Sequence, residues 1–342
     1  MSFDPDAAAV SDSGIFGLPF TREEAHIILT PVPFDATTSY RRGTARGPQI
    51  IQEASMQVDL YDRRLGKIYA QGIYMEEEDA SIAALGEKAA HAAEPIIEAG
   101  GVENLADSTM ATKLLTQVNT ASEHVNQFTF DATRKVLATG KIPGLIGGDH
   151  ATPFGAIRAV AEQYKDIGIL HIDAHMDFRD AFEGFTWSHA SIMHNVLSRI
   201  PAVTKMVQVG IRDFGQRELE FAQSQGKRVD IYFDDQIAQR LLEGEKYSAL
   251  CKEIIAKLPD NVYISFDIDG LDPSLCPDTG TPVPGGLSFH QTAFLLEALK
   301  SSGKHIVGFD LVEVSNNPES TNEINGVVGA RMLYKLCGLF SR

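Results

Sequence analysis

Short, continuously apolar segments alternate with helical patterns through most of this chain, and this alternation is what most constrains its fold. The apolar runs lie at 143–147, 167–172, 205–211, 229–233, 262–268 and 305–311. Helical patterns separate most of them, at 152–165, 215–227, 236–257, 288–302 and 322–340. Strands that are apolar throughout are typical of a parallel sheet covered by helices on both faces. The sequence therefore predicts an α/β fold of three layers, α/β/α, with a central, mostly parallel sheet.

The first part of the chain differs in character from the rest. Residues 1–22 are polar, small and acidic, and we interpret them as an N-terminal arm, either loose or lying on a neighbour. Residues 23–342 show no composition break that would indicate a second domain. Further elements expected here are a buried strand at IILTPV after His26, helices at 48–56 and 83–100, and one or two helices at 107–139.

Charge and cysteine content narrow the class of protein. Lys and Arg number 30 against 46 Asp and Glu, and the net charge of -16 argues against nucleic acid or an anionic membrane as a partner. Three cysteines without a CxxC motif form no disulfide framework, which fits a reducing cytoplasm. The start, MSFDPDAAAVSDSG, lacks the basic and apolar parts of a signal peptide, and no apolar run has the ~18 residues of a membrane span.

Polar residues collect where several of the apolar runs end. In an open α/β sheet the ligand site lies beyond the carboxyl ends of the strands. Gly147, Gly148, Asp149 and His150 directly follow one run, where the glycines permit a tight turn and His150 points out of the sheet end. Taken alone, a histidine at a strand end is more often structural than a ligand.

The next run ends in a stronger signal. Asp173, His175 and Asp177 occupy alternate positions, and in an extended chain a period of two places all three side chains on one side. Two carboxylates and an imidazole on one face repel and lose hydration unless a cation lies among them. The pattern indicates a metal site; a solvated acidic loop is the alternative.

Asp267 and Asp269 share a face in the same way after the run VYIS, whereas Asp272 before Pro273 is typical of a turn or cap. Two His and four Asp then make six ligands, which suit Mn²⁺ and also Zn, Ni or Fe. Six ligands exceed what one small ion normally takes from a protein. Bridging carboxylates can hold two ions about 3.5–4 Å apart, and such a pair lowers the pKa of a shared water.

Together these motifs resemble the ureohydrolase family, which includes arginase and agmatinase. The matching segments are PVPFDATTSYRRGTARGP at 31–48, GGDH at 147–150, DAHMD at 173–177, SFDIDGLDP at 265–273, TGTPVPGGL at 279–287 and VEV at 312–314. The resemblance implies an arginase-like fold for a single ureohydrolase domain at 23–342. It also implies two Mn²⁺ per subunit, with Ni²⁺ as an alternative, and a homo-oligomer, a trimer or hexamer.

The resemblance also implies a role for each matching residue. One ion would be held by His150, Asp173, Asp177 and Asp267, and the other by His175, Asp173, Asp267 and Asp269, with Asp173 and Asp267 bridging. Glu313 would pair with the guanidinium of the substrate, and Thr281 would line the pocket. His189 would protonate the leaving amine, and Asp269 would steady the tetrahedral intermediate. The alternatives are a solvent-facing acid at Glu313 and a histidine that only packs at His189.

The loop at 178–188 is expected to form part of the pocket wall. It lacks the Ser/Asn-rich character usual in arginases and instead offers the acids Asp180 and Glu183 and aromatic residues that include Trp187. Acids with aromatics suit a distal ammonium, so agmatine, hydrolysed to putrescine and urea, is the first expected substrate. Arg179 could instead meet a carboxylate, as in 4-guanidinobutanoate or formiminoglutamate. Free guanidine and arginine complete the set of small guanidino substrates.

Two other classes of protein remain open at this point. A deacetylase-like amidohydrolase on a similar fold would cut an acyl amide and would not need a glutamate facing a guanidinium. A non-catalytic metal-binding protein could keep the fold, but would be expected to lose the counterparts of His189 and Glu313, and both are present.

Overall fold

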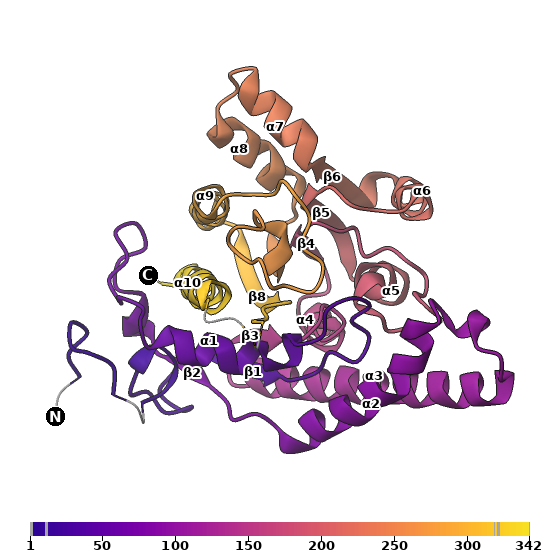
Figure 1. The fold of residues 1–342 in the computed structure, drawn as a ribbon. Coiled ribbons are helices and arrows are strands. Elements are labelled where there is room, and N and C mark those ends of the chain that lie inside the picture. The colour runs from indigo at the N-terminus through magenta and orange to yellow at the C-terminus, as the bar shows by residue number, and fades with distance from the viewer. Residues whose placement is uncertain (1–2, 11–12, 318, 320–321, 342) are drawn as a thin grey trace.

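The computed structural model describes residues 3–10, 13–317, 319 and 322–341. Its centre is an eight-stranded sheet in the order β2-β1-β3-β8-β7-β4-β5-β6, and every strand pair is parallel. The predicted three-layer fold is confirmed (Figure 1). Within these residues no helix is both long and apolar enough to cross a membrane.

The strands agree closely with the apolar runs. They are β1 (Ile27–Val32), β2 (Ile73–Met75), β3 (Ile142–Gly147), β4 (Ile167–Ile172), β5 (Val203–Ile211), β6 (Val229–Phe233), β7 (Asn261–Asp267) and β8 (His305–Val312). Only the edge strand β2 was not predicted, because three residues at a sheet edge carry too little pattern.

The helices cover both faces of this sheet. They are α1 (Gly47–Ser55), α2 (Ala80–Glu98), α3 (Ser108–Leu137), α4 (Phe154–Tyr164), α5 (Ile192–Arg199), α6 (Gln216–Ser224), α7 (Asp234–Leu242), α8 (Tyr247–Lys257), α9 (Phe289–Ser301) and α10 (Ile324–Gly338). The region 107–139 forms one helix, α3. The single helix expected at 236–257 is two, because the chain turns at Gly244, whose φ of 94° suits glycine.

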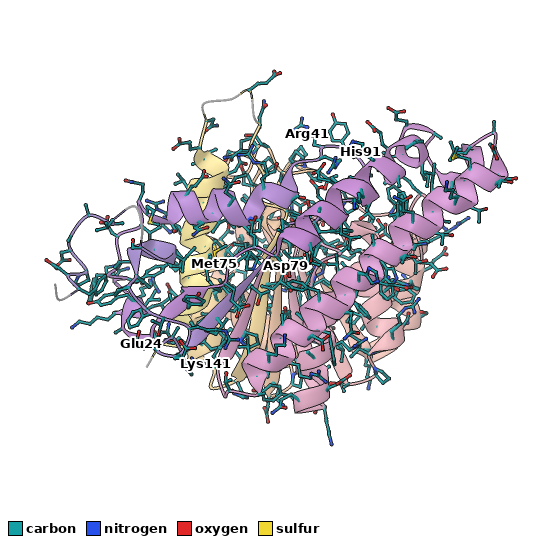
Figure 2. The ribbon with its side chains drawn as sticks, turned by 90° about the horizontal axis from the view of Figure 1, so that it is seen from below. Glu24, Arg41, Met75, Asp79, His91 and Lys141 are labelled. Atoms are coloured by element: carbon teal, nitrogen blue, oxygen red, sulfur yellow. The ribbon has the colours of Figure 1, made fainter. Side chains whose placement is uncertain are left out.

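The two faces of the sheet bury separate cores. Leu170 and Ile172 of β4 pack with residues of α1 and α7–α10, and Ile167 and Ile169 pack with residues of α4, α5 and α6. The alternation along β4 follows from the period of two in a strand. A further cluster joins α2 and α3 to the sheet, and Figure 2 shows these two long helices crossing its outer side.

Part of the segment expected to be an arm packs on this chain's own core. Ile15, Phe16 and Leu18 are buried. The backbone N–H of Phe16 donates to Ser55 Oγ at 2.9 Å, and the rings of Phe16 and Tyr334 lie 4.8 Å apart. These contacts join the start of the chain to α1 and α10.

The strand order brings distant segments together at one edge. β3, β8, β7 and β4 are neighbours in the sheet. Because the strands are parallel, the segments that follow them, beginning at residues 148, 313, 268 and 173, leave the same edge.

Gly148 is needed for close packing between the loop that follows β3 and the loop that follows β1. Its backbone φ is not left-handed, so the turn expected to require glycine is not the reason for it. A Cβ atom at this position would lie 1.9 Å from the carbonyl oxygen of Phe34, in the loop that follows β1. The backbone N–H of Asp149 donates to the same oxygen at 2.9 Å, which fixes the approach.

We expect Gly148→Ala to lower the free energy of unfolding by about 3 kcal/mol or more, because overpacking of this kind moves backbone. Gly226→Ala is the control: no heavy atom lies within 4 Å of its added Cβ, and only its φ of 57° is unfavourable, at a cost of about 1 kcal/mol. Urea denaturation measures both changes, and equal losses would contradict the packing argument.

Candidate metal centre and active site

The segments at the ends of β3, β4 and β7 assemble a buried cluster of histidines and aspartates. His150 follows β3, Asp173, His175 and Asp177 follow β4, and Asp267 and Asp269 lie at the end of β7. Asp173, Asp267, Asp269 and His150 are each at most 3% exposed. Residues predicted to share a site from three separate segments therefore do lie together.

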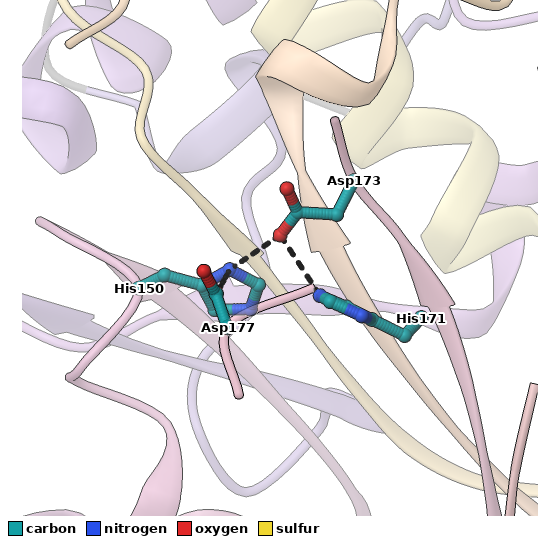
Figure 3. Close-up of side chains that lie close together, drawn as sticks. All are labelled: His150, His171, Asp173 and Asp177. Atoms are coloured by element: carbon teal, nitrogen blue, oxygen red, sulfur yellow. Dashed lines mark hydrogen bonds and ion pairs between the residues drawn. The ribbon is translucent and has the colours of Figure 1, made fainter. Parts of the chain in front are cut away.

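His150 is the centre of the first group (Figure 3). Its Nδ1 lies 3.0 Å from Asp173 Oδ2, 3.2 Å from Asp177 Oδ2 and 3.3 Å from Asp267 Oδ2. Among the described residues this buried nitrogen nevertheless has no hydrogen bond of acceptable geometry. A ring nitrogen directed between three carboxylate oxygens is the donor set of a divalent cation.

A second group shares Asp173 with the first. His175 Nδ1 lies 3.1 Å from Asp269 Oδ2 and 3.5 Å from Asp173 Oδ1, and ligand atoms of these three residues lie within 4.8 Å of one another. The two carboxylate oxygens of Asp173 thus face different groups. This arrangement offers two neighbouring positions for an ion with one carboxylate between them.

Backbone amides fix the orientation of these carboxylates. Asp173 Oδ1 accepts from the N–H of His175 at 2.6 Å, Asp267 Oδ1 from Asp269 at 2.8 Å, and Asp269 Oδ1 from Ala174 at 3.0 Å. The D-x-H and D-x-D spacing therefore does more than place side chains on one side. Each first aspartate also closes a turn on the residue two positions later.

The charges of the cluster do not balance by themselves. Burial, together with repulsion from Asp269 and Asp173, raises the pKa of Asp267 well above its usual range. Burial would lower the pKa of His150, but the carboxylates of Asp173, Asp177 and Asp267 close to its Nδ1 raise that pKa well above its usual value. Both shifts favour the protonated forms of Asp267 and His150, and binding of divalent cations would release these protons. The donor set fits two such ions.

Glu313 lies beside this cluster in a strained conformation. It follows β8 with a left-handed φ of 62°, which a non-glycine residue adopts at a cost of about 1–3 kcal/mol. Its Oε1 accepts from the backbone N–H of His150 at 2.9 Å. Its Oε2 is buried and, within the part of the chain that the structure describes, has no partner. A buried carboxylate oxygen without a partner is suited to a cationic donor.

His189 connects Glu313 to the cavity. Its Nδ1 lies 3.4 Å from Glu313 Oε1 and its Nε2 lies 3.3 Å from Ser39 Oγ. Burial would lower the pKa of His189, but the bond to Glu313 and the charges of Asp149 and Asp177 raise it above its usual value. The residue can therefore hold a proton at neutral pH. Ser39 was not singled out from the sequence, although it lies within the matching segment 31–48.

A cavity of about 150 Å³ opens over the cluster. Thr281, predicted to line the pocket, does so, and its Oγ1 lies 3.3 Å from Asp269 Oδ2. The lining residues are Ser39, His150, His175, Asp177, Arg179, Phe182, His189, Ala190, Asp213, Phe214, Glu218, Asp267 and Thr281.

The loop at 178–188 contributes other residues than those expected. The side chain of Asp180 is 95% exposed, and its Oδ1 lies 3.7 Å from His194 Nδ1. Trp187 packs on Phe154 and under Arg199 instead of reaching the cavity. Neither these two residues nor Glu183 lines the cavity. The loop turns back at Glu183 and Gly184, whose φ values are 55° and 97°, and this turn decides which side chains face inward.

Arg179 and Phe182 of this loop do line the cavity, together with Asp213, Phe214 and Glu218 from the segment after β5. The guanidinium of Arg179 lies 4.4 Å from the centre of the Phe182 ring, and its Nε lies 3.6 Å from Glu218 Oε2. Glu218 itself accepts backbone N–H groups of Phe178 and Gly215. β5 ends at the same sheet edge as the strands that carry the cluster. This placement could have indicated from the sequence that the segment after β5 lines the cavity.

The sequence model of the arginase family matches residues 25–338 of this chain. N(1)-aminopropylagmatine ureohydrolase from a strain of Thermus thermophilus is 32% identical over 318 residues, which cover 93% of this chain and 91% of that protein. Agmatinase from Bacillus anthracis is 29% identical, covering 86% and 84% of the two chains. The crystal structure of agmatine ureohydrolase of Thermoplasma volcanium superposes with a TM-score of 0.72 at 26% identity, covering 96% and 94%.

Removal of Asp267 tests the metal centre directly. We expect Asp267→Ala to abolish tight binding of both ions, because its Oδ2 lies 3.3 Å from His150 Nδ1 of the first group and the family resemblance makes its carboxylate a ligand of both ions. Mn²⁺ at 100 times its Kd should stabilise the wild type by about 2.7 kcal/mol and should not shift the melting temperature of the variant.

Asp272→Ala is the matched control, because this aspartate lies in the same loop but caps a turn at Ser274. It should keep two ions and the full thermal shift. Two ions still bound to Asp267→Ala, measured by elemental analysis after gel filtration, would refute the shared position of Asp267.

Proposed function

This chain belongs to the arginase family, and we propose that it hydrolyses a small guanidino compound to urea and an amine at two divalent ions. The observation that carries this proposal is the unpartnered Oε2 of Glu313 beside the buried histidine and aspartate cluster. A free carboxylate oxygen next to a metal centre suits a cationic, planar group that must be held close to the ions.

The proposed ligand sets are those expected from the family resemblance. His150, Asp173, Asp177 and Asp267 would hold one ion, and His175, Asp173, Asp267 and Asp269 the other. Imidazole with hard carboxylate oxygens favours Mn²⁺, and Ni²⁺ is the alternative. When bound, two such ions lower the pKa of a shared water, which supplies a nucleophile near neutral pH.

The residues around the ions would bind and orient the substrate. Glu313 would accept N–H groups of the guanidinium through Oε2 and hold its central carbon toward the ions. Thr281 Oγ1, next to Asp269, would bond the reacting centre, and Asp269 would steady the tetrahedral intermediate. His189 would hold a proton on Nε2, on the side of the cavity, and transfer it to the leaving amine.

Agmatine is the first proposed substrate. Phe182, Phe214 and the carboxylate of Asp213, which line the cavity, suit the distal ammonium of agmatine. The relatives named as agmatinase and aminopropylagmatine ureohydrolase support the same choice. We further propose that the protein acts in the cytoplasm as a homo-oligomer.

A guanidino acid such as 4-guanidinobutanoate is the second candidate, and Arg179 is the observation that favours it. The Arg179 guanidinium lies against Phe182 and beside Glu218. Its side chain donates no hydrogen bond within the described residues, so its Nη donors remain available to a carboxylate. Formiminoglutamate would be held in the same way. Free guanidine would use neither Arg179 nor Asp213, and arginine would use both.

Urea release tests the proposed chemistry. We expect the protein, stripped of metal and restored with Mn²⁺ or Ni²⁺, to release urea from one of agmatine, 4-guanidinobutanoate, arginine and guanidine. Glu313→Gln should lower kcat/KM at least ~10-fold, since a charged hydrogen bond contributes about 1.5–3 kcal/mol. His189→Asn should lower kcat about 10²–10⁴-fold.

Both variants should keep two ions, which separates loss of catalysis from loss of metal. Acetyl-lysine serves as the substrate of the competing class, a deacetylase-like amidohydrolase. Acetate release from it, without urea release from any guanidino compound and without formamide release from formiminoglutamate, would refute the proposal.

A pair of charge-removing substitutions distinguishes the substrate classes. We expect Asp213→Asn to raise KM for agmatine about 10-fold and to leave 4-guanidinobutanoate unaffected. Arg179→Gln should do the reverse, because each side chain meets only the distal charge of opposite sign. If each substitution changed KM equally for both compounds, neither residue would recognise the distal group of the substrate.

A further inference from the structure

Four polar side chains form a buried row across the centre of the sheet. Asp310 of β8, Ser265 of β7, His171 of β4 and Gln208 of β5 are register neighbours, one from each strand. All four are fully buried. Each of them stands between apolar neighbours in its strand. The four residues are called the polar row below. None of the roles assigned so far uses them.

The hydrogen atoms on Gln208 and His171 can be assigned, because a neighbouring carbonyl oxygen can only accept a hydrogen bond. Gln208 Nε2 lies 2.8 Å from the carbonyl oxygen of Met176, which can only accept. The amide nitrogen therefore donates there, and it also donates to His171 Nδ1 at 2.9 Å. His171 Nδ1 must then carry a lone pair, so the ring proton is on Nε2 and is donated to Asp173 Oδ2 at 2.8 Å.

The second half of the row gives the same tautomer for His150, but there the lone pair on Nδ1 faces the cluster. Asp310 Oδ1 accepts the backbone N–H of Phe266 at 3.1 Å and the Ser265 hydroxyl at 3.0 Å. With its only hydrogen used, Ser265 Oγ accepts from His150 Nε2 at 3.0 Å. When the His150 ring is neutral, as it would be with an ion bound, its lone pair is thus on Nδ1, the nitrogen that faces Asp173, Asp177 and Asp267.

From these bonds we infer that the polar row is the outer layer of the metal centre and decides which histidine binds an ion. His150 presents a lone pair to the ion. His171 lies within ligand distance of the same carboxylates (Figure 3), but both of its ring nitrogens are engaged. It acts as a positioning residue that directs Asp173. This inference rests on the proposed two-metal site.

The row has a physical reason to exist in an apolar sheet. A ligating carboxylate keeps its direction only if its remaining lone pairs are bonded, and outer partners of this kind typically change metal affinity about 10–100-fold. Buried polar groups without such a use would reduce stability. His171 holds Oδ2 of Asp173, the residue shared by both groups, so its removal affects both ions.

Mn²⁺ titration of the metal-free protein tests the assignment by calorimetry and by metal content at saturation. We expect His171→Gln and His171→Leu to bind two ions per chain with affinity lowered about 10–100-fold, less in Gln, which retains an N–H donor. His150→Gln should lose at least one ion, because the first group then lacks its only lone pair on nitrogen.

A double-mutant cycle tests the chain of bonds. Gln208→Leu should weaken Mn²⁺ binding in the same direction, and combining it with His171→Leu should weaken binding no further, because Gln208 acts through His171. Thr292→Val, at a buried hydroxyl of α9 bonded to Ser288, should leave Mn²⁺ affinity unchanged. Circular dichroism checks that each variant is folded.

The outcomes separate this inference from the proposed function. Loss of one ion in His171→Leu would make His171 a ligand and overturn the inference, while the two-metal hydrolase would stand. Unchanged affinity in His171→Leu, or additive losses in the double variant, would equally overturn it. A wild type that binds no Mn²⁺ or Ni²⁺ would refute both.

Discussion

Burial of four aspartates at one edge of the sheet is the constraint on which the rest of this structure depends. Such carboxylates, if unpaired, would cost several kcal/mol each in an apolar interior. Backbone amides and histidines compensate part of this, and divalent cations would compensate the remainder. The buried carboxylates therefore lower the stability of the fold and give the site a strong electrostatic preference for cations.

The sheet supports this arrangement through side chains as well as through its strand order. In a parallel sheet covered on both faces, each strand contributes mostly apolar residues, and here the polar row replaces them at one level. The row connects the cluster to buried residues within the strands themselves. Glu313 and His189 lie beside the cluster, where a left-handed backbone and a short 3₁₀ turn hold them. The proposed catalytic residues thus lie in loops, whereas the polar row lies within the sheet.

The sequence allowed the fold and the metal cluster to be predicted, but not the pocket wall. β4 coincides with its apolar run because burial on both faces leaves an uninterrupted signal. The alternating aspartates were recognisable because their spacing has a chemical reason. Strand register is not encoded locally, so the pairing of His171 with Gln208 could not be read from either segment. The direction of Asp180 depends on a turn at Glu183 that only packing specifies.

The strand order also bears on when the site can form. β3 and β8 are neighbours although residues 148–304 separate them, and the first metal position draws on segments near 150, 173 and 267. Contacts of such sequence separation form late, because loop-closure entropy must be overcome first. An ion therefore meets its ligands only after the sheet is complete. Metal occupancy in this protein would lengthen the lifetime of the native state by slowing unfolding, and would leave the rate of folding unchanged.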